Sequence, residues 1–314
     1  MKLPFQKALI TGGAGFIGSH IAEALINAGC TVNIIDNLST GHLINLDGLK
    51  DRITFFQEDI RNADAVNAAA KDCEVIFHLA AQVSVPQSVE DPVASAMINE
   101  IGMLNVLQAA RNNGVKKIVF SSSSAVYGDD PVMPKKEDML PCSLSPYAVQ
   151  KLSGEEYAKV YGKLFGIGAV SLRYFNVFGP RQDPSSPYSG VISIFMNLAI
   201  AEKSPLIYGD GEQYRDFVFV KDVVKANLLA ASSDKADGRS LNIGTGIKTT
   251  INALWDQVRN LAGSNADPEY EPARNGDIRE SVAAVDLASS VLEFNADCLF
   301  ADGLKLTFDW YKNN

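Results

Sequence analysis

The chain has 314 residues, of which 46% are hydrophobic and 21% are charged. This length fits one large domain or a large and a small one, and the composition excludes a mainly disordered chain. The formal net charge of −9 argues against broad nucleic-acid binding, which needs a basic face, and no apolar run approaches the roughly 20 residues of a membrane span.

The start of the chain and its cysteines bear on location. Lys2 and Lys7 precede an uncharged stretch that imitates a secretory signal, but glycines interrupt it, Glu23 soon follows and no small-residue cleavage site is present. The four cysteines form neither a CxxC pair nor a metal-spaced set with histidines: Cys30, Cys73, Cys142 and Cys298. We therefore expect a cytoplasmic protein without a disulfide framework or a metal site.

Apolar runs and helical patterns alternate through the first half of the chain. The predicted strands cover residues 7–11, 31–35, 53–57, 75–79, 117–121 and 170–174. The predicted helices cover 18–28, 63–71, 92–113 and 146–165, the last with Ser145 as its N-cap and Pro146 at its first position. This alternation predicts an α/β fold with a doubly wound parallel sheet and helices on both faces.

The pattern changes after residue 175. Residues 178–190 are rich in Pro, Ser and Gly and are predicted to form a loop, whereas the remainder mixes short helices, such as 191–201 and 222–231, with isolated strands. We predict a first domain over 1–175 and a smaller, mixed α/β lobe over 176–314, of which about 217–245 returns to the first domain.

A glycine-rich loop joins the first predicted strand to the first helix. Gly12, Gly15 and Gly18 allow a tight turn, a close backbone approach to a pyrophosphate, and close packing of the helix on the strand. Asp36 ends the second strand, about 20 residues further on, where a carboxylate accepts hydrogen bonds from ribose hydroxyls and repels a 2′-phosphate. The loop predicts a Rossmann-like domain that binds NAD rather than NADP. The alternative is a flexible turn with an unrelated aspartate.

Tyr147 and Lys151 lie four residues apart on a predicted helix, so they share one face. A phenol with a pKa of about 10 is a poor base at pH 7, but a neighbouring ammonium and a cationic nicotinamide stabilise the phenolate, typically by about 1–3 pKa units. Residues 121–124 are serines that continue from the carboxyl end of a strand, where ligands bind in open α/β sheets. Together they predict a base for an alcohol proton and a hydroxyl that holds the reacting oxygen. Taken separately, they also fit a surface pair and a polar loop.

Five motifs follow one another in order: TGGAGFIG, HLAAQ, SSSSAVYG, SPYAVQK and RYFNVFGPR. Together they resemble the extended short-chain dehydrogenase/reductase family, and within it the NAD-dependent nucleotide-sugar epimerases, over about residues 7–311. The resemblance implies that Ser123 is the catalytic serine, that Tyr147 is the base, and that Lys151 is its partner and also holds the nicotinamide ribose. An adenine contact is implied for Asp59, for which a plain loop carboxylate is the alternative.

The resemblance also implies a complete NAD site. Its residues are Gly12, Gly15, Phe16, Ile17, Gly18, Asp36, Asn37, Ser39, Gly41, Asp59, Ile60, Leu79, Ala80, Ala81, Gln82, Asn99, Ser121, Tyr147, Lys151, Tyr174 and Val177.

At two places the sequence differs from the motifs of relatives that catalyse other reactions, and these differences limit the reactions that the resemblance implies. Relatives that dehydrate or decarboxylate the sugar carry an acid in the pattern (S/T)-x-E-V-Y-G, where this chain has Ala125. Relatives that act on UDP-glucuronate carry an arginine after AAQ, where residues 83–87 offer no cation. What remains is oxidation and re-reduction at C4 of an uncharged hexose with tightly bound NAD, which is a 4-epimerisation. A dehydratase or decarboxylase of the same family and a non-catalytic NAD-sensing regulator are the alternatives.

The resemblance assigns the UDP-sugar mainly to the second lobe. The implied contacts are Ser84, Ser123, Tyr147, Asn176, Val191, Tyr208, Arg215, Arg274, Asp277 and Ser281. Arg215 and Arg274 are the implied diphosphate cations, for which solvated surface charges are the alternative.

Ser281 stands where a bulky tyrosine restricts the family's pocket to plain hexoses. It therefore implies room for an N-acetyl group, so that UDP-GlcNAc and UDP-GalNAc are interconverted and UDP-Glc and UDP-Gal are also accepted. An arbitrary polar loop residue is the alternative.

The resemblance further implies a homodimer, in which helices 92–113 and 146–165 of two subunits pair as a four-helix bundle. The side chains available for this pairing, unless they only cover the sheet, are Leu104, Leu107, Tyr157, Tyr161 and Leu164. Neither a nucleic acid nor a membrane is expected as a partner.

Overall fold

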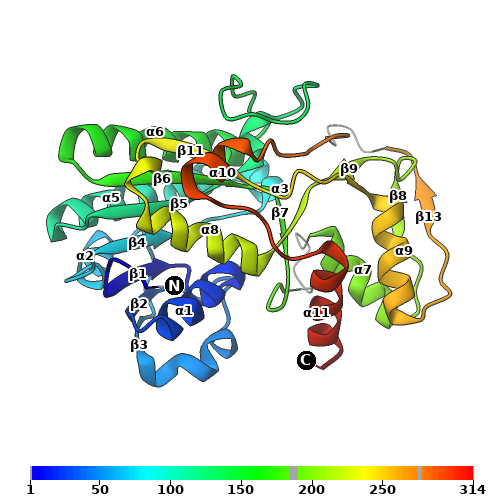
Figure 1. Ribbon diagram of the computed structural model, residues 1–314, viewed down its shortest axis with the longest axis horizontal. Helices are drawn as coiled ribbons and strands as arrows, with labels where there is room; N and C mark the ends of the chain where they lie inside the picture. The colour runs from blue at the N-terminus through cyan, green and yellow to red at the C-terminus, as the bar shows by residue number, and fades with distance from the viewer. Residues whose placement is uncertain (1, 184–189, 274–277, 314) are drawn as a thin grey trace.

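The computed structural model describes residues 2–183, 190–273 and 278–313. Its main sheet is built from β1 (Lys7–Thr11), β2 (Thr31–Ile35), β3 (Ile53–Phe56), β4 (Val75–His78), β5 (Lys117–Ser123), β6 (Gly168–Tyr174) and β11 (Arg239–Ile243). Among the described residues these strands are all parallel, in the order β11-β6-β5-β4-β1-β2-β3 (Figure 1). The strand order reverses beside β1, which creates a crevice at the carboxyl ends of the strands.

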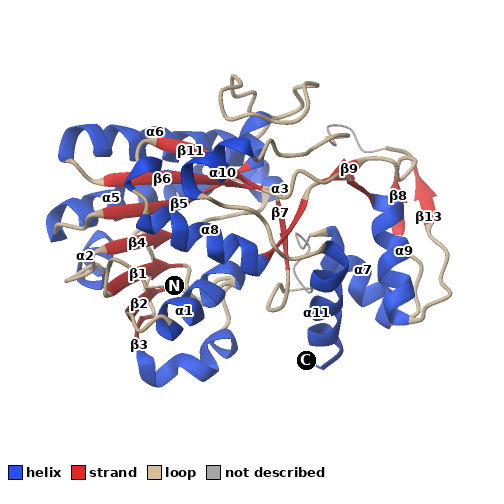
Figure 2. Cartoon of the chain, in the orientation of Figure 1, coloured by secondary structure: helices blue, strands red, loops and turns tan. Residues whose placement is uncertain are grey.

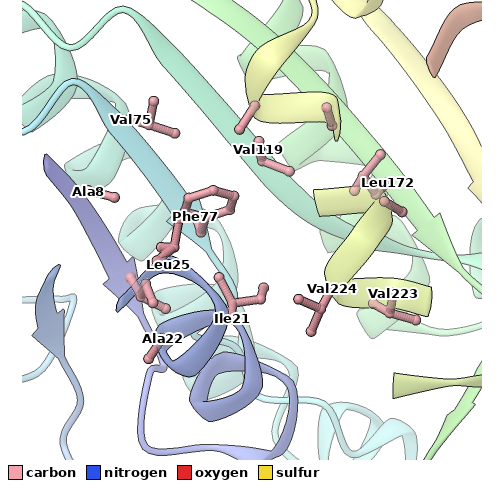
Figure 3. Close-up of a cluster of buried hydrophobic side chains, with 14 of the residues drawn as sticks. Ala8, Ile21, Ala22, Leu25, Val75, Phe77, Val119, Leu172, Val223 and Val224 are labelled. Atoms are coloured by element: carbon pink, nitrogen blue, oxygen red, sulfur yellow. The ribbon is translucent and has the colours of Figure 1, made fainter. Parts of the chain in front are cut away.

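Helices cover both faces of this sheet (Figure 2). One face carries α1 (Phe16–Asn27), α8 (Val220–Ser232) and α10 (Asp286–Leu292), and the other carries α2 (Ala63–Ala69), α5 (Gly102–Asn113) and α6 (Pro146–Phe165). In Figure 3, Ile21 of α1 lies near Phe77 of β4, Val223 of α8 lies on the side of Leu172 of β6, and all four are buried. The prediction of a Rossmann-like, doubly wound parallel sheet is confirmed.

The remaining elements are further helices, 3₁₀ segments and two-stranded pairs. The helices are α3 (Val85–Glu90), α4 (Pro92–Ala96), α7 (Val191–Ile200), α9 (Ile251–Ala262) and α11 (Phe300–Asn313), with 3₁₀ segments at η1 (Leu43–Arg52), η3 (Ser124–Tyr127) and η4 (Asp234–Ala236). The strands are β7 (Asn176–Phe178), β8 (Leu206–Tyr208), β9 (Tyr214–Arg215), β10 (Phe217–Phe219), β12 (Thr249–Thr250) and β13 (Glu269–Glu271), which pair as β7–β10, β8–β13 and β9–β12.

A smaller lobe lies beside the sheet, at the right of Figure 1, and contains α7, α9 and α11. It has an apolar core of its own, in which the rings of Phe195 and Trp255 meet edge to face with centroids 5.3 Å apart. Phe178 and Phe219 of the β7–β10 pair belong to the same core. Among the described residues, no helix combines the length and the apolar character needed to cross a membrane.

The helix predicted over 92–113 is interrupted by a π-helical turn, η2 (Met97–Ile101), between α4 and α5. The turn buries the amide of Asn99, and a Cβ on Gly102 would lie only 2.4 Å from Cδ1 of Ile60. A regular helical periodicity does not predict such a turn, which commonly marks a functional site.

Candidate active site

The glycine loop forms a closely packed cradle between β1 and α1. Gly12 has a φ of +72°, and a Cβ at this position would lie 2.7 Å from the backbone N of Ala80. A Cβ on Gly18 would lie 2.2 Å from the carbonyl oxygen of Gly12. Gly15 is the N-cap of α1 and makes no side-chain cap, so Phe16 and Ile17 begin the helix with N–H groups that face the loop.

Asp36 follows β2 directly and its side chain is nearly buried, with 8% of its surface exposed. Its Oδ2 accepts a hydrogen bond from the N–H of Ala14 (2.9 Å), and its Oδ1 accepts one from the N–H of Leu38 (2.8 Å). A Cβ on Gly41 would lie 2.9 Å from both carboxylate oxygens. The carboxylate is therefore fixed beside the glycine loop.

The loop after β3 holds a second carboxylate. Arg61 donates hydrogen bonds from Nε (2.9 Å) and Nη2 (2.8 Å) to Asp59, and Asn37 donates another at 2.8 Å. These bonds lower the pKa of Asp59 to about 2, so it is ionised at neutral pH. Ser39 donates its backbone N–H to Oδ1 of Asn37, while Ile60 is buried against α5.

The loop from Leu79 to Gln82 lies against the glycine loop and is held by Asn99. The N–H of Gln82 donates to Oδ1 of Asn99 (2.8 Å), while Nδ2 of Asn99 donates to the carbonyl of Gln82 (3.0 Å) and to Oε1 of Gln150 (2.7 Å). Thr11 accepts from the N–H of Ala80 at 3.2 Å. Asn99 thus positions the loop that carries Ala80, Ala81 and Gln82. The sequence gives no local signal for the partner residues Gln150 and Thr11.

Tyr147 and Lys151 share the inner face of α6, beside the carboxyl end of β5. Both are nearly buried, with exposed fractions of 9% and 4%. Nζ of Lys151 donates to the carbonyl of Ser121 (2.7 Å) and lies 5.8 Å from the centre of the Tyr147 ring. The hydroxyl of Ser123 lies close enough to that of Tyr147 to act on the pKa of the phenol. The structure therefore brings the three predicted catalytic side chains together.

Local sequence explains how α6 reaches this position. Ser145 caps the helix, because its Oγ accepts from the N–H of Ala148 (3.2 Å), and Pro146 occupies the first turn. Gly154 follows Lys151 on the same face, and a Cβ there would lie 2.5 Å from the ring of Phe120. Its missing side chain lets the helix lie directly on β5.

Three of the predicted UDP-sugar residues, Asn176, Arg215 and Ser281, lie on segments that are joined by hydrogen bonds. Asn176 begins β7 and donates its backbone N–H to the carbonyl of Asp216 (3.0 Å). Arg215 donates to the carbonyl of Arg279 (3.3 Å), and Ser281 donates its N–H to the carbonyl of Tyr214 (3.2 Å).

The other predicted binding residues lie on several different elements. Val191 begins α7, Tyr208 ends β8, and Val177 lies in β7. Ser84 caps α3 by accepting from the N–H of Gln87 (3.2 Å). Tyr174 ends β6, and its hydroxyl donates to Asn227 of α8 (3.0 Å) inside the core. Arg274 and Asp277 lie outside the described residues.

Comparison with known proteins places this site in a family. Residues 8–244 match the NAD-dependent epimerase/dehydratase family. The chain is 39% identical to the UDP-glucose 4-epimerase of Mycolicibacterium smegmatis over 312 residues, which cover 98% of this chain and 99% of that protein. The chain belongs to the NAD-dependent epimerase/dehydratase family.

Solved structures give the same result for this epimerase/dehydratase. A UDP-N-acetylglucosamine 4-epimerase from Methanobrevibacter ruminantium, in complex with UDP-N-acetylmuramic acid, is 43% identical with a TM-score of 0.95, covering 100% of this chain and 99% of that one. A UDP-glucose 4-epimerase from Thermotoga maritima with UDP-glucose is 39% identical with a TM-score of 0.94, covering 98% and 99%. The resemblance read from the five motifs is confirmed.

NAD is the cofactor of this family, and the residues of this chain fit it. The cradle at Gly12, Gly15 and Gly18 keeps backbone N–H groups clear of side chains, as a pyrophosphate requires. Each carboxylate oxygen of Asp36 accepts one protein hydrogen bond and keeps a free lone pair for a ribose hydroxyl. Burial raises the pKa of Asp36, and its ionised carboxylate repels a 2′-phosphate.

Burial dominates the electrostatics of the tyrosine–lysine pair in this epimerase/dehydratase. It raises the pKa of Tyr147, and the hydrogen bond from Ser123 acts in the opposite direction. It lowers the pKa of Lys151 to about 7, against the effect of the nearby Glu155 carboxylate. In the protein alone, Lys151 therefore does not bring the phenol of Tyr147 below its ordinary pKa.

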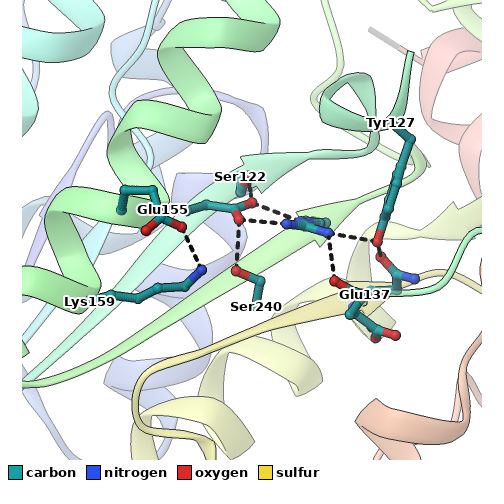
Figure 4. Close-up of polar contacts among 9 residues, drawn as sticks. Ser122, Tyr127, Glu137, Glu155, Lys159 and Ser240 are labelled. Atoms are coloured by element: carbon teal, nitrogen blue, oxygen red, sulfur yellow. Dashed lines mark hydrogen bonds and ion pairs between the residues drawn. The ribbon is translucent and has the colours of Figure 1, made fainter. Parts of the chain in front are cut away.

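A buried ion pair joins Glu155, one turn after Lys151 on α6, to Arg173 of β6. Figure 4 shows the polar contacts around Glu155. Glu155 accepts from Nε (2.9 Å) and Nη2 (2.8 Å) of Arg173, and also bonds the hydroxyls of Ser122 and Ser240 (2.7 Å for Ser240). Nη1 of Arg173 donates to the hydroxyl of Tyr127 (2.9 Å). This network joins α6 to β5, β6 and β11. It was missed in the sequence, although a charge within an apolar strand was a usable signal.

Proposed function

We propose that this chain is a UDP-hexose 4-epimerase that interconverts UDP-GlcNAc with UDP-GalNAc and UDP-Glc with UDP-Gal. The observation that carries the proposal is the cluster of Ser123, Tyr147 and Lys151 at the carboxyl end of β5, in a site that suits NAD. The two UDP-glucose 4-epimerases and the UDP-N-acetylglucosamine 4-epimerase that resemble the chain over nearly its whole length support it.

Each catalytic side chain has a distinct part. Tyr147 takes the proton from O4 of the hexose and later returns it. Ser123 bonds the same oxygen and keeps it within reach of the phenol. Lys151, fixed by the carbonyl of Ser121, keeps Nζ 5.8 Å from the centre of the phenol ring and binds the nicotinamide ribose. Bound NAD supplies the acceptor and donor for the hydrogen on C4, and its positive ring adds the charge that counters the burial of Tyr147.

Epimerisation requires that first one face and then the other face of C4 be presented to the nicotinamide. The proposal therefore assigns the tight contacts to the UDP moiety, through Asn176, Arg215, Arg274 and Asp277, and loose contacts to the hexose. Ser84, Val191 and Tyr208 are the remaining proposed contacts of the UDP-sugar.

An epimerase is favoured over a dehydratase or decarboxylase by Ala125. Its backbone N–H bonds Oγ of Ser123 (3.1 Å), and its methyl side chain offers no proton to a leaving group. The intact Tyr147 and Lys151 pair argues against a regulator that has lost catalysis.

The proposed reaction is tested with four substrates. We expect purified enzyme, without added nicotinamide, to convert UDP-Glc, UDP-Gal, UDP-GlcNAc and UDP-GalNAc into their C4 epimers, which chromatography separates. Mass spectrometry should show no change of mass. Loss of water or of carbon dioxide would instead identify a dehydratase or a decarboxylase, and an absolute requirement for added cofactor would indicate a net dehydrogenase.

Replacement of Ser281 tests the sugar preference. We expect Ser281→Tyr to lower kcat/KM for UDP-GlcNAc by about tenfold or more, because an overfilled pocket typically costs about 1–3 kcal/mol, and to leave UDP-Glc turnover nearly unchanged. Ser281→Ala, which keeps the space, is the matched control and should accept both pairs. Equal turnover of the acetylated pair by the tyrosine variant would show that Ser281 does not set specificity.

The homodimer is supported by the helices α3 to α6, which expose several apolar side chains. Exposed fractions are 72% for Val93, 45% for Met97, 45% for Val160 and 68% for Leu164. We expect Val160→Glu to convert a dimer into a monomer in light scattering after size exclusion. Ile44→Glu, at an equally apolar exposed site on η1, is the control and should stay dimeric. An unchanged mass for the Val160 variant would contradict the four-helix interface.

We also propose that residues 1–175 bind NAD and 176–314 mainly hold the UDP-sugar. The pairing of β11 with β6 supports the return of about residues 217–245 to the first domain. A cytoplasmic location stays a prediction.

A further inference from the structure

Asp216 lies between Arg215 and β10, and none of its surface is exposed. Its Oδ1 accepts from the N–H (2.8 Å) and the hydroxyl (2.7 Å) of Thr245, and its Oδ2 accepts from the N–H groups of Gly246 (2.9 Å) and Ala283 (3.1 Å). One carboxylate thus joins two loops that are far from it in the sequence.

The backbone of Asp216 binds a third segment. Its carbonyl accepts from the backbone N–H (3.0 Å) and from Nδ2 (3.2 Å) of Asn176. Asp216 is also the direct neighbour of Arg215, and Ala283 is two residues from Ser281. Three of the proposed UDP-sugar residues, Asn176, Arg215 and Ser281, therefore come from separate segments that meet at one buried residue, Asp216.

The backbone segments around the Asp216 carboxylate are closely packed. A Cβ on Gly244 would lie 2.6 Å from Oδ2 of Asp216, and Gly246 has a φ of +73°. Ala283 forms a parallel bridge with Lys135, whose carbonyl accepts from the N–H of Ala284 (2.8 Å). The donors that face the carboxylate are consequently fixed on both sides.

We propose that Asp216 is the positioning residue of the UDP-sugar site, which sets the relative placement of Asn176, Arg215 and Ser281. The proposal rests on the proposed function. Asp216 is buried beneath these residues and does not touch the substrate, so it acts through them. It stands apart from the glycine loop and from Tyr147, so it governs the binding of the UDP-sugar rather than the binding of NAD or the chemistry at C4.

The test compares Asp216→Asn with the wild-type enzyme. An amide at this position turns an NH₂ group toward at least one fixed backbone N–H, whichever way it is oriented. We expect KM for the UDP-sugar and Kd for UDP to rise about tenfold or more, because a lost or mispositioned buried hydrogen bond is typically worth about 1–3 kcal/mol. We expect kcat and the amount of tightly bound NAD to stay close to wild type.

Asp222→Asn is the matched control. Asp222 is also a buried carboxylate and accepts from the N–H groups of Asp297 (3.0 Å) and Cys298 (3.2 Å). This variant should lose stability in the same way without a change in KM. If it raises KM as much as Asp216→Asn does, the effect reflects general destabilisation and the proposal is overturned.

A milder pair of variants serves if Asp216→Asn does not fold. Thr245→Val removes the hydroxyl bond to Oδ1 and the bond that the same hydroxyl accepts from the N–H of Ile247 (3.1 Å), and Thr245→Ser retains both. We expect KM and the Kd for UDP to rise about tenfold in the valine variant, because a hydrogen bond to a charged group is typically worth about 1.5 kcal/mol or more, and to return to wild type in the serine variant. Equal values in the two variants would overturn the proposal.

The outcomes also separate this inference from the proposed function. If the wild-type enzyme converts no UDP-hexose, the proposed function fails, and calorimetric binding of UDP to wild type and Asp216→Asn still decides the role of Asp216. If turnover is normal and Asp216→Asn leaves KM and UDP affinity unchanged, or lowers kcat alone, only the positioning role fails.

Discussion

Tyr147→Phe is expected to lower kcat for epimerisation at least about a hundredfold, the usual effect of removing one general acid–base group. The substitution removes the hydroxyl that exchanges a proton with O4 and keeps the ring, which lies 5.8 Å from Nζ of Lys151. The aromatic packing and the backbone bond from Tyr147 N–H to Oγ of Ser88 (3.2 Å) stay in place. Initial rates with saturating UDP-Glc and UDP-GlcNAc measure the effect.

Tyr161→Phe is the matched control for this experiment. Tyr161 lies on the same helix, and its hydroxyl makes a single long bond of 3.4 Å to Gln108. The control should turn over at close to the wild-type rate. If Tyr147→Phe does the same while it keeps its bound NAD, another group is the base.

Arg173→Met is expected to lower the free energy of unfolding by about 3–5 kcal/mol, the typical cost of leaving one partner of a buried ion pair alone. Arg173 is 3% exposed and Glu155 is 0% exposed, so the remaining carboxylate has no access to solvent. Urea unfolding at pH 7, followed by circular dichroism, measures the difference. A decrease in the free energy of unfolding of less than about 1 kcal/mol would contradict the expected cost of leaving the buried Glu155 carboxylate alone.

The double variant Glu155→Met/Arg173→Met separates the pair from its surroundings. Since it leaves no isolated buried charge, we expect it to be more stable than Arg173→Met alone. If it is equally unstable, the loss comes from packing and from the bonds to Ser122, Ser240 and Tyr127 instead.

The pH dependence of stability provides a second test of the same ion pair. Hydrogen bonds from Arg173 and its charge outweigh burial and hold the pKa of Glu155 below its usual value of 4.5. A carboxylate with a lowered pKa in the folded state stabilises fully above its unfolded pKa and loses this contribution as the pH falls below it. Wild-type stability should therefore decline more steeply below pH 4.5 than that of the double variant.

The sequence predicts the parts of this protein that local pattern controls. Alternating apolar strands and amphipathic helices predict the sheet. The spacing of Gly12, Gly15 and Gly18 predicts the cradle at the carboxyl end of β1. The spacing of Tyr147 and Lys151 predicts a shared face, because one helical turn brings residues four apart together.

The parts that the sequence did not reveal depend on contacts between distant segments. The π-helical turn at Asn99 is bound to Gln82 and Gln150, and no periodicity encodes those partners. Asp216 is likewise defined by Thr245 and Ala283, which only the folded chain brings to it. The pKa of Tyr147 also could not be predicted from its spacing to Lys151, since burial raises it and Ser123 is the group that acts in the opposite direction.

The central claim is that the hydrogen on C4 leaves the sugar and returns to the same carbon on the other face. Purified enzyme, without added nicotinamide, is incubated in ordinary water with UDP-glucose that carries deuterium at C4, and the UDP-galactose product is analysed by mass spectrometry and proton NMR. The account predicts a product of unchanged mass with the deuterium still on C4. Replacement of the deuterium by hydrogen from water would contradict it.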